Sequence, residues 1–283
     1  MNREPTHTID QATIAQYSTD GAVCIRGQFD QDWIELMYSA CVRMMTDPEA
    51  KKREVDNPDD PGYYFVSAHM SRQNEDFRRY VVESPAAEIA ARVMRLHEVR
   101  FFYDQLFIKD PGTQAPTPWH NDLPFWNFAG ENIASVWLAL TPVSAATSGV
   151  VYVAGSHRWN TLYRAITPDF DEAFMDESLD LCPEFHKEFD NPAYRFLSWD
   201  LEPGDVIVHH PMVVHGSGRN ESTTRRRVAL SCRYFGGDAI WTERKTGFRV
   251  PGASRSPNIR FGEAPHDDTV FPVAWQSPDR HLG

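Results

Sequence analysis

The stretch Arg225-Arg-Arg-Val-Ala-Leu-Ser-Cys-Arg-Tyr234 alternates between two faces, as an extended strand does. One face carries Arg226, Val228, Leu230, Cys232 and Tyr234. The other carries Arg225, Arg227, Ala229, Ser231 and Arg233, a polar set that suits solvent. We therefore expect Arg226 to enter the apolar side of a β-rich core. Its guanidinium would need an anion there, and a carboxylate matches its geometry.

Further short strands separated by turns are predicted around this stretch. They cover residues 100–109, 133–140, 150–153, 205–209 and 213–215. So many short strands around an inward-facing site predict a mainly β protein with flanking helices. Its core is expected to be a jelly roll, also called a double-stranded β-helix.

The rest of the chain is expected to surround this core within one domain, residues 1–283. Helices are predicted over 9–18, 30–46 and 84–97, with a strand over 22–25 and an exposed loop over 48–62. The expected layout is a helical outer layer over about 9–98 and a core over about 100–240. An insertion over 158–196, expected to act as a lid or mobile loop, and a C-terminal extension over 241–283 complete it.

A candidate metal site lies in Pro118-Trp-His-Asn-Asp122. Side chains two residues apart in an extended segment share a face, so His120 and Asp122 can reach one ion. His215 is the expected third ligand, because Val213-Val-His215 is extended and ends at a glycine; His209 and His210 are the alternatives. Two imidazoles and one carboxylate leave coordination positions open, as in non-haem Fe(II) oxygenases.

Other histidines fit structural roles better. A second His-x-Asp pattern at His266-Asp-Asp268 lies outside the strand-rich region, and we expect no metal there. His157, in Gly155-Ser-His157, is expected to support a turn.

Composition limits the classes of function. The formal net charge of −12 argues against nucleic-acid binding through a general basic surface. No apolar run is long enough to cross a membrane, and the N-terminus lacks the apolar core of a signal peptide. Four scattered cysteines predict free thiols. We therefore expect a cytoplasmic protein with a small-molecule substrate; the sequence does not indicate its oligomeric state.

Several motifs in their order resemble one known family. They are Trp119-His-Asn-Asp-Leu-Pro-Phe-Trp126, Ser148-Gly-Val-Val-Tyr-Val-Ala-Gly-Ser-His157, Pro203-Gly-Asp205 and His215-Gly-Ser-Gly-Arg-Asn220, followed by Arg226. Over roughly residues 11–245 the chain resembles the phytanoyl-CoA dioxygenase (PhyH) family of Fe(II)- and 2-oxoglutarate-dependent oxygenases. Ser148 and Ala154 depart from the Asn and Pro usual in that family, which concerns loop shape more than chemistry.

The resemblance implies a role for each of these residues. His120, Asp122 and His215 would bind Fe(II), and Arg226 would bind the distal carboxylate of 2-oxoglutarate. O2 would then drive oxidation of a C–H bond, with release of succinate and CO2. Halogenating relatives replace the carboxylate ligand with a small residue, so the retained Asp122 favours hydroxylation or another oxidation.

Further residues are candidates to contact the cosubstrate or the substrate. Polar or aromatic side chains on the expected inner faces are candidates for 2-oxoglutarate: Trp137, Lys109, Gln105 and Ser135. The rings after the metal ligands, with more distant residues, are candidates for the wall of a partly apolar substrate site: Phe125, Trp126, Phe128, His69 and Trp241, and more weakly Tyr63, Tyr64 and Phe65. Core packing is the alternative for each ring.

Two other functions remain open for this barrel. One is a hydrolase or isomerase that uses zinc or another divalent ion, and the other is a non-catalytic sensor that binds 2-oxoglutarate. A carboxylate-binding arginine beside the metal argues against the first, and an intact ligand set argues against the second.

Overall fold

The computed structural model describes residues 1–283 except 48–51, 56–61, 168–170 and 279–283. Its helices are α1 (Gln11–Asp20), α2 (Gln31–Met44), α3 (Glu75–Glu83) and α4 (Ala86–Met94). The carboxylates of Asp10 and Asp30 accept hydrogen bonds from backbone N–H groups in the first turns of α1 and α2, which fixes where these helices begin. Three helices fall close to the predicted ranges, whereas α3 was not predicted.

The larger sheet forms one wall of the molecule. In spatial order its strands are β1 (Ala22–Ile25), β10 (Val206–His209), β7 (Ile133–Ala139), β12 (Arg227–Phe235), β4 (Glu98–Lys109), β3 (Tyr64–Ala68) and β2 (Lys52–Val55), and β14 (Val273–Gln276) also pairs with β4. Its described strands pair antiparallel with their neighbours. Residues 52–55 form strand β2 instead of part of the predicted loop; most of the remaining loop lies outside the described residues.

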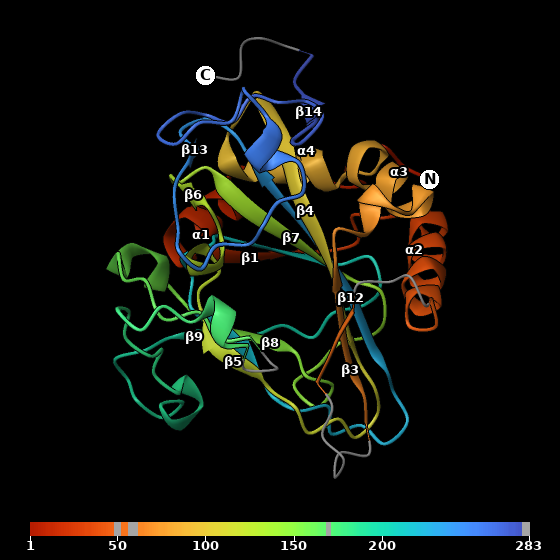
Figure 1. Cartoon of the computed structure of the whole chain (residues 1–283). Coiled ribbons are helices and arrows are strands. Elements are labelled where there is room, and N and C mark those ends of the chain that lie inside the picture. The colour runs from red at the N-terminus through yellow and green to blue at the C-terminus, as the bar shows by residue number, and fades with distance from the viewer. Residues whose placement is uncertain (48–51, 56–61, 168–170, 279–283) are drawn as a thin grey trace.

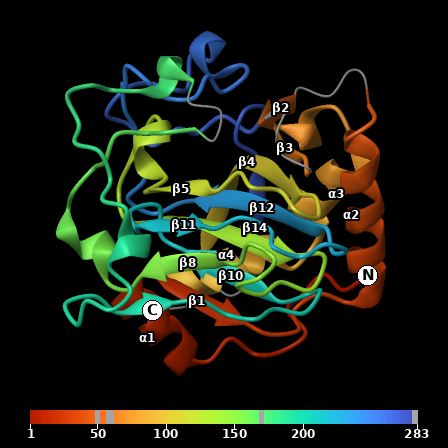
Figure 2. The same ribbon diagram turned by 90° about the horizontal axis from the view of Figure 1, so that it is seen from below.

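A smaller antiparallel sheet lies across from the larger one. Its order is β5 (Thr117–His120), β11 (His215–Ser217), β8 (Val150–Val153) and β9 (Phe196–Leu197). Figure 1 shows this sheet on the side of the larger sheet away from α2, α3 and α4, and Figure 2 shows β5, β11 and β8 side by side in front of β12. A short ladder joins β6 (Phe128–Ala129) to β13 (Ile240–Trp241). Two facing antiparallel sheets are the arrangement expected of a jelly roll.

The helices cover the outer face of the larger sheet and decide the orientation of β12. Val228, Leu230, Cys232 and Tyr234 belong to one buried cluster together with helix residues such as Ile34 and Ile89. The apolar face of β12 therefore points outward, toward the helices.

The opposite face of β12 is turned into the barrel, so the expectation that it faces solvent is wrong. Arg227, Ala229, Ser231 and Arg233 are all buried, and both arginines line the interior pocket. The sequence pattern gave the two faces correctly. The apolar face nevertheless lies outside the barrel, because a layer of helices buries it there.

The insertion and the C-terminal extension both pack on the barrel. Phe185 is buried against Val153 and Val214 on the outside of the smaller sheet. Phe271, from the extension, packs in a second cluster around Phe102 and Phe128. Within the described residues, no helix is long and apolar enough to cross a membrane.

Candidate metal centre

His120, Asp122 and His215 converge at the mouth of the barrel. His120 ends β5 and His215 begins β11, and the two residues are direct partners in the ladder. The Oδ1 atom of Asp122 lies 3.4 Å from Nε2 of His120 and 3.8 Å from Nε2 of His215. One ligand atom from each of the three residues lies within 4.8 Å of the others. This donor set fits a divalent metal ion with three protein ligands.

Backbone carbonyls fix the tautomer of both imidazoles. Nδ1 of His120 donates to the carbonyl of Pro118 (2.7 Å), and Nδ1 of His215 donates to that of Val213 (3.0 Å). The lone pairs are therefore on the Nε2 atoms, which face Asp122.

The protonation states also suit a metal. Burial lowers the pKa of His215 well below its ordinary value, which keeps the ring neutral. Burial by itself would raise the pKa of Asp122, but its polar contacts with His120 and His209 and nearby positive charge hold it well below the usual range. A neutral imidazole and an ionised carboxylate are the forms that bind metal.

His209 supports the carboxylate and does not join the triad. Its Nε2 atom lies 3.3 Å from Oδ2 of Asp122, and its Nδ1 atom lies 3.2 Å from the hydroxyl of Tyr152. Ser135, expected to contact the cosubstrate, instead donates to the same Oδ2 atom at 3.4 Å. Both residues hold the oxygen of Asp122 that faces away from His120 and His215, and they orient the other toward the two imidazoles.

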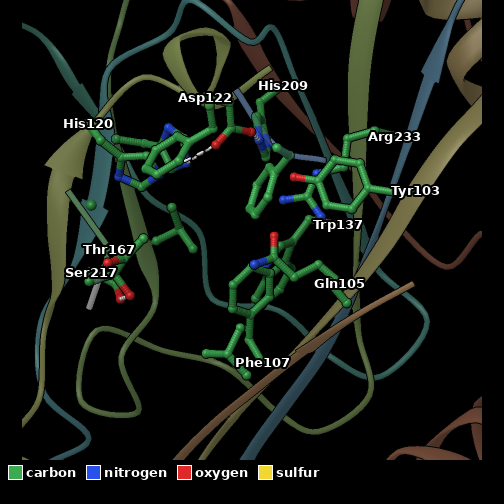
Figure 3. A pocket seen from close by; sticks show the side chains of 18 of the residues that line it. Tyr103, Gln105, Phe107, His120, Asp122, Trp137, Thr167, His209, Ser217 and Arg233 are labelled. Atoms are coloured by element: carbon green, nitrogen blue, oxygen red, sulfur yellow. Dashed lines mark hydrogen bonds and ion pairs between the residues drawn. The ribbon is translucent and has the colours of Figure 1, made fainter. Parts of the chain in front are cut away.

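A cavity of about 330 Å³ opens beside the triad, which is large enough for a small organic molecule. Figure 3 shows His120 and Asp122 on one side of it and Tyr103, Gln105 and Arg233 on the other. Most of its lining is aromatic or aliphatic: Tyr64, Val66, Tyr103, Phe107, Phe125, Trp126, Trp137, Val150, Tyr152, Ile166 and Phe248.

Arg227 is a buried cation at one end of this cavity. The residue is only 2% exposed, and its guanidinium carbon lies 5.8 Å from the centre of the Trp137 ring. Its Nε and Nη2 atoms have no hydrogen-bond partner among the described residues. Burial lowers the pKa of this guanidinium. A buried charge of this kind calls for an anion.

Hydroxyl groups lie on the facing strands at the same end. The hydroxyl of Thr117 lies 3.1 Å from that of Tyr64 and accepts a hydrogen bond from that of Ser217 at 3.0 Å, and all three residues line the cavity with Arg227. Thr117 and Ser217 lie on β5 and β11, the strands that carry His120 and His215.

Arg226 does not enter the barrel, so its predicted orientation is wrong. Its side chain is 34% exposed, and its Nε donates to Asp110 at 2.5 Å. It precedes β12 and does not line the cavity. The neighbouring Arg227 lines the cavity, because the face of β12 opposite to Arg226 is the one that is turned inward.

The structure separates the other candidates into lining and supporting residues. Trp137, Gln105, His69, Phe125 and Trp126 line the cavity with the weaker candidate Tyr64. Lys109 is buried beneath it, where its Nζ donates to Ser148 and to the carbonyl of Gly218. Phe128 and Trp241 pack on each other with ring centres 5.1 Å apart, in the core behind the cavity, and Phe65 lies in the core under the helices.

The remaining histidines lie elsewhere. Nε2 of His210 lies 3.3 Å from a carboxylate oxygen of Glu131, beside α1. His157 contacts the carbonyl of Ser18 near the end of α1, which agrees with a structural role. In the second His-x-Asp pattern, Asp267 accepts hydrogen bonds from the Thr269 hydroxyl and backbone, and thus caps a turn.

Several lining residues were not predicted from the sequence. Alternation placed Arg227 and Arg233 on one face of the strand, but that face was expected to meet solvent. For this reason neither arginine was predicted to line the barrel. Tyr103 shares a predicted inner face with Gln105. Ile166, Thr167 and Phe248 come from irregular segments, where no periodicity indicates which side chains turn inward.

A jelly roll that carries His-x-Asp and a distant histidine beside an open cavity defines the class of non-haem iron oxygenases. The sequence matches the phytanoyl-CoA dioxygenase (PhyH) family over residues 17–228. The chain therefore belongs to this family of Fe(II)- and 2-oxoglutarate-dependent oxygenases, and His120, Asp122 and His215 are its facial triad.

Individual relatives agree with this membership. The chain is 27% identical over 252 residues to the multifunctional dioxygenase prhA of Penicillium brasilianum, which covers 82% of this chain and 74% of that protein. It is 27% identical over 190 residues to the peroxisomal phytanoyl-CoA dioxygenase of Rattus norvegicus, covering 59% of this chain and 48% of that protein.

Solved structures show the same fold. The epimerase SnoN from nogalamycin biosynthesis, solved with Fe3+, α-ketoglutarate and nogalamycin RO, superimposes with a TM-score of 0.72 at 21% identity. That match covers 94% of this chain and 98% of SnoN. The predicted double-stranded β-helix is thereby confirmed.

Proposed function

We propose that the protein uses Fe(II), 2-oxoglutarate and O2 to oxidise, most simply to hydroxylate, a C–H bond of a small, partly apolar organic molecule. Bound at the triad, iron and 2-oxoglutarate supply the oxidising chemistry, with succinate and CO2 as the coproducts. The residues of the chain hold these groups, orient the substrate and keep water away from the reacting carbon.

The buried guanidinium of Arg227 is the observation that carries this proposal. A cosubstrate that chelates the metal through one end has one free carboxylate, and Arg227 offers a buried guanidinium to receive it. Tyr64, Thr117 and Ser217 add hydroxyl groups at the same end, and Trp137 forms a flat wall beside it. Metal-dependent hydrolysis does not itself need a carboxylate-binding cation beside the metal, which favours an oxygenase.

The apolar lining supports the proposed kind of substrate. Phe125 and Phe248 stack with ring centres 6.0 Å apart, and Phe174, from the insertion, lies 5.1 Å from Phe248. Rings gathered beside an open coordination position form a surface for an apolar carbon skeleton. We also propose that the insertion covers this side of the cavity, to which it contributes Ile166 and Thr167.

The free cysteines support a reducing compartment such as the cytoplasm, which we propose as the location. Cys24, Cys41, Cys182 and Cys232 are all unbonded, and two of them are buried.

The test is succinate formation by the purified protein with Fe(II), 2-oxoglutarate and O2, first alone and then with a panel of small molecules. We expect slow uncoupled turnover that a true substrate accelerates, and loss of both in D122A and H215A. Zinc in place of iron should give no succinate. Tight 2-oxoglutarate binding without O2 uptake under any condition would indicate a sensor and contradict the proposal.

A further inference from the structure

A second buried arginine lies in the cavity, and the proposed function leaves it without a role. Arg233 is on the inner face of β12, is 3% exposed, and projects from the wall opposite His120 (Figure 3). Its Nη1 atom donates to the carbonyl of Ser231 at 3.2 Å, while its Nε atom has no hydrogen-bond partner within the part of the chain that the structure describes. Among the described residues, no carboxylate forms an ion pair with it.

Three aromatic rings surround this guanidinium without providing an acceptor. Its central carbon lies 4.5 Å from the centre of the Tyr103 ring, 5.9 Å from that of Trp126 and 6.0 Å from that of Phe107. Ring faces stabilise a cation in part. They provide no acceptor for the Nε–H group, and an unsatisfied donor is costly in a buried site.

Neighbouring groups add further donors on the same wall. The hydroxyl of Tyr103 accepts a hydrogen bond from Nε1 of Trp126 at 3.0 Å, so its own proton is directed elsewhere. Gln105, two residues along β4 from Tyr103, presents an amide to the cavity. A cation, a hydroxyl and an amide together match an anionic oxygen ligand.

The position of Arg233 separates it from the proposed cosubstrate site. Arg227 is opposite Lys109 in the β12–β4 ladder, whereas Arg233 is opposite Tyr103 and, on the other side, Ser135. Six residues of extended strand span about 20 Å, so the two arginines belong to different ends of the cavity. The carboxylate of the cosubstrate that is free of the metal can pair with only one of them, and in the proposed function that residue is Arg227.

We propose that Arg233 binds a carboxylate of the organic substrate, which makes the substrate a small hydrophobic acid. This inference rests on the proposed function. The acid group lies against Arg233, Tyr103 and Gln105, and the carbon skeleton lies along Phe125 and Phe248 beside the triad. Arg233 then sets both the specificity and the orientation of the carbon that is oxidised.

The test compares acids with their amides on the intact protein under argon, loaded with Fe(II) and saturated with 2-oxoglutarate. The probes are matched acid and amide pairs of graded shape: butanoic, decanoic, cyclohexanecarboxylic and 3-phenylpropanoic. We expect at least one acid to bind about tenfold or more tightly than its amide, as one charge-assisted hydrogen bond would give. R233Q should remove this preference, and R233K should retain part of it.

Two further variants make the result specific. R226Q alters a partly exposed arginine of the same segment and should behave as the wild type. R227Q, titrated at saturating 2-oxoglutarate, should keep the acid preference. The affinity for 2-oxoglutarate, measured separately, should change less than about twofold in R233Q and fall in R227Q.

Several outcomes would overturn the inference. One is equal binding of acid and amide in every pair, and another is a preference for the acid that is unchanged in R233Q. A third is loss of 2-oxoglutarate affinity in R233Q, which would place the cosubstrate at Arg233. Failure of the wild type to bind 2-oxoglutarate at all would instead contradict the proposed function. R233K keeps the test decisive if R233Q does not fold.

Discussion

Nε2 of His209 lies 3.3 Å from Oδ2 of Asp122, the oxygen that does not face the other two ligands. The hydroxyl of Tyr152, 3.2 Å from Nδ1 of His209, continues this chain. If Tyr152 donates to Nδ1, then Nε2 carries the proton and donates to Asp122. A hydrogen bond to the distal oxygen restricts rotation of the carboxylate and keeps Oδ1 directed at the metal position.

Replacing His209 with alanine should therefore weaken iron binding by about 10- to 100-fold, the usual effect of losing a partner of a metal ligand. Y152F should have a smaller effect in the same direction. Anaerobic Fe(II) titration measures both. H210A is the matched control, because His210 pairs with Glu131 away from the triad. Equal affinities in H209A and H210A would show that His209 does not orient Asp122.

Metal binding should stabilise the protein only when the triad is intact. At a free Co(II) concentration 100 times its dissociation constant, linkage predicts about 2.7 kcal/mol of added stability. For a chain of this size that is a rise in Tm of roughly 4 to 5 °C. Scanning calorimetry of the wild type, H215A and D122A tests this, with EDTA to reverse it. A rise of the same size in H215A would place the metal elsewhere.

Arg226 and Arg227 are adjacent in sequence and should differ sharply in function. R227Q should raise the KM for 2-oxoglutarate by about tenfold or more, because it removes a charge-assisted contact. R226Q loses only a partly exposed ion pair with Asp110 and should change KM by less than about twofold. Succinate formation at varied 2-oxoglutarate measures both. A larger rise in KM for R226Q than for R227Q would show that Arg226 binds the free carboxylate of the cosubstrate.

Asp104 should make stability depend on pH. It lies on β4 and is fully buried, and burial raises its pKa to about 6, although hydrogen bonds from Ser71 act in the opposite direction. The folded pKa is above the unfolded value, so the folded state binds the proton more tightly. Stability from this residue is present at low pH and is lost as pH rises through about 6.

Between pH 5 and pH 8, ionisation of Asp104 should lower the free energy of unfolding of the wild type by about 1.4 kcal/mol. D104N should not show this decrease. Urea unfolding of both proteins at the two pH values gives the difference. S71A removes a hydrogen bond that favours the ionised carboxylate and should move the transition to higher pH. A constant difference between D104N and wild type across this range would contradict the assignment.

Local sequence patterns predicted most of the elements but not all of them. Strand 150–153 and the ranges of β4, β7 and β12 follow from alternation, and α1 and α2 begin at aspartate caps. Strands β6, β9 and β13 have only two residues each and carry no period to detect. They exist because a neighbouring strand supplies their hydrogen bonds, which is a property of the tertiary structure.

The sequence by itself determined the donor types of the metal centre and the two faces of β12. The i, i+2 spacing puts His120 and Asp122 on one side of an extended segment wherever that segment lies. Alternation likewise separates Arg226 from Arg227 and Arg233. Both are consequences of local backbone geometry.

Only the tertiary structure decided which face of β12 lines the cavity, and therefore which arginines lie in it. Alternation defines two faces of a strand but does not tell which of them lies inside the barrel. That choice is made when helices α1 to α4 bury the apolar face and the smaller sheet closes over the polar one. The same closure pairs His215 with His120 across 95 residues of sequence, because the β5–β11 ladder joins segments that have no local relation.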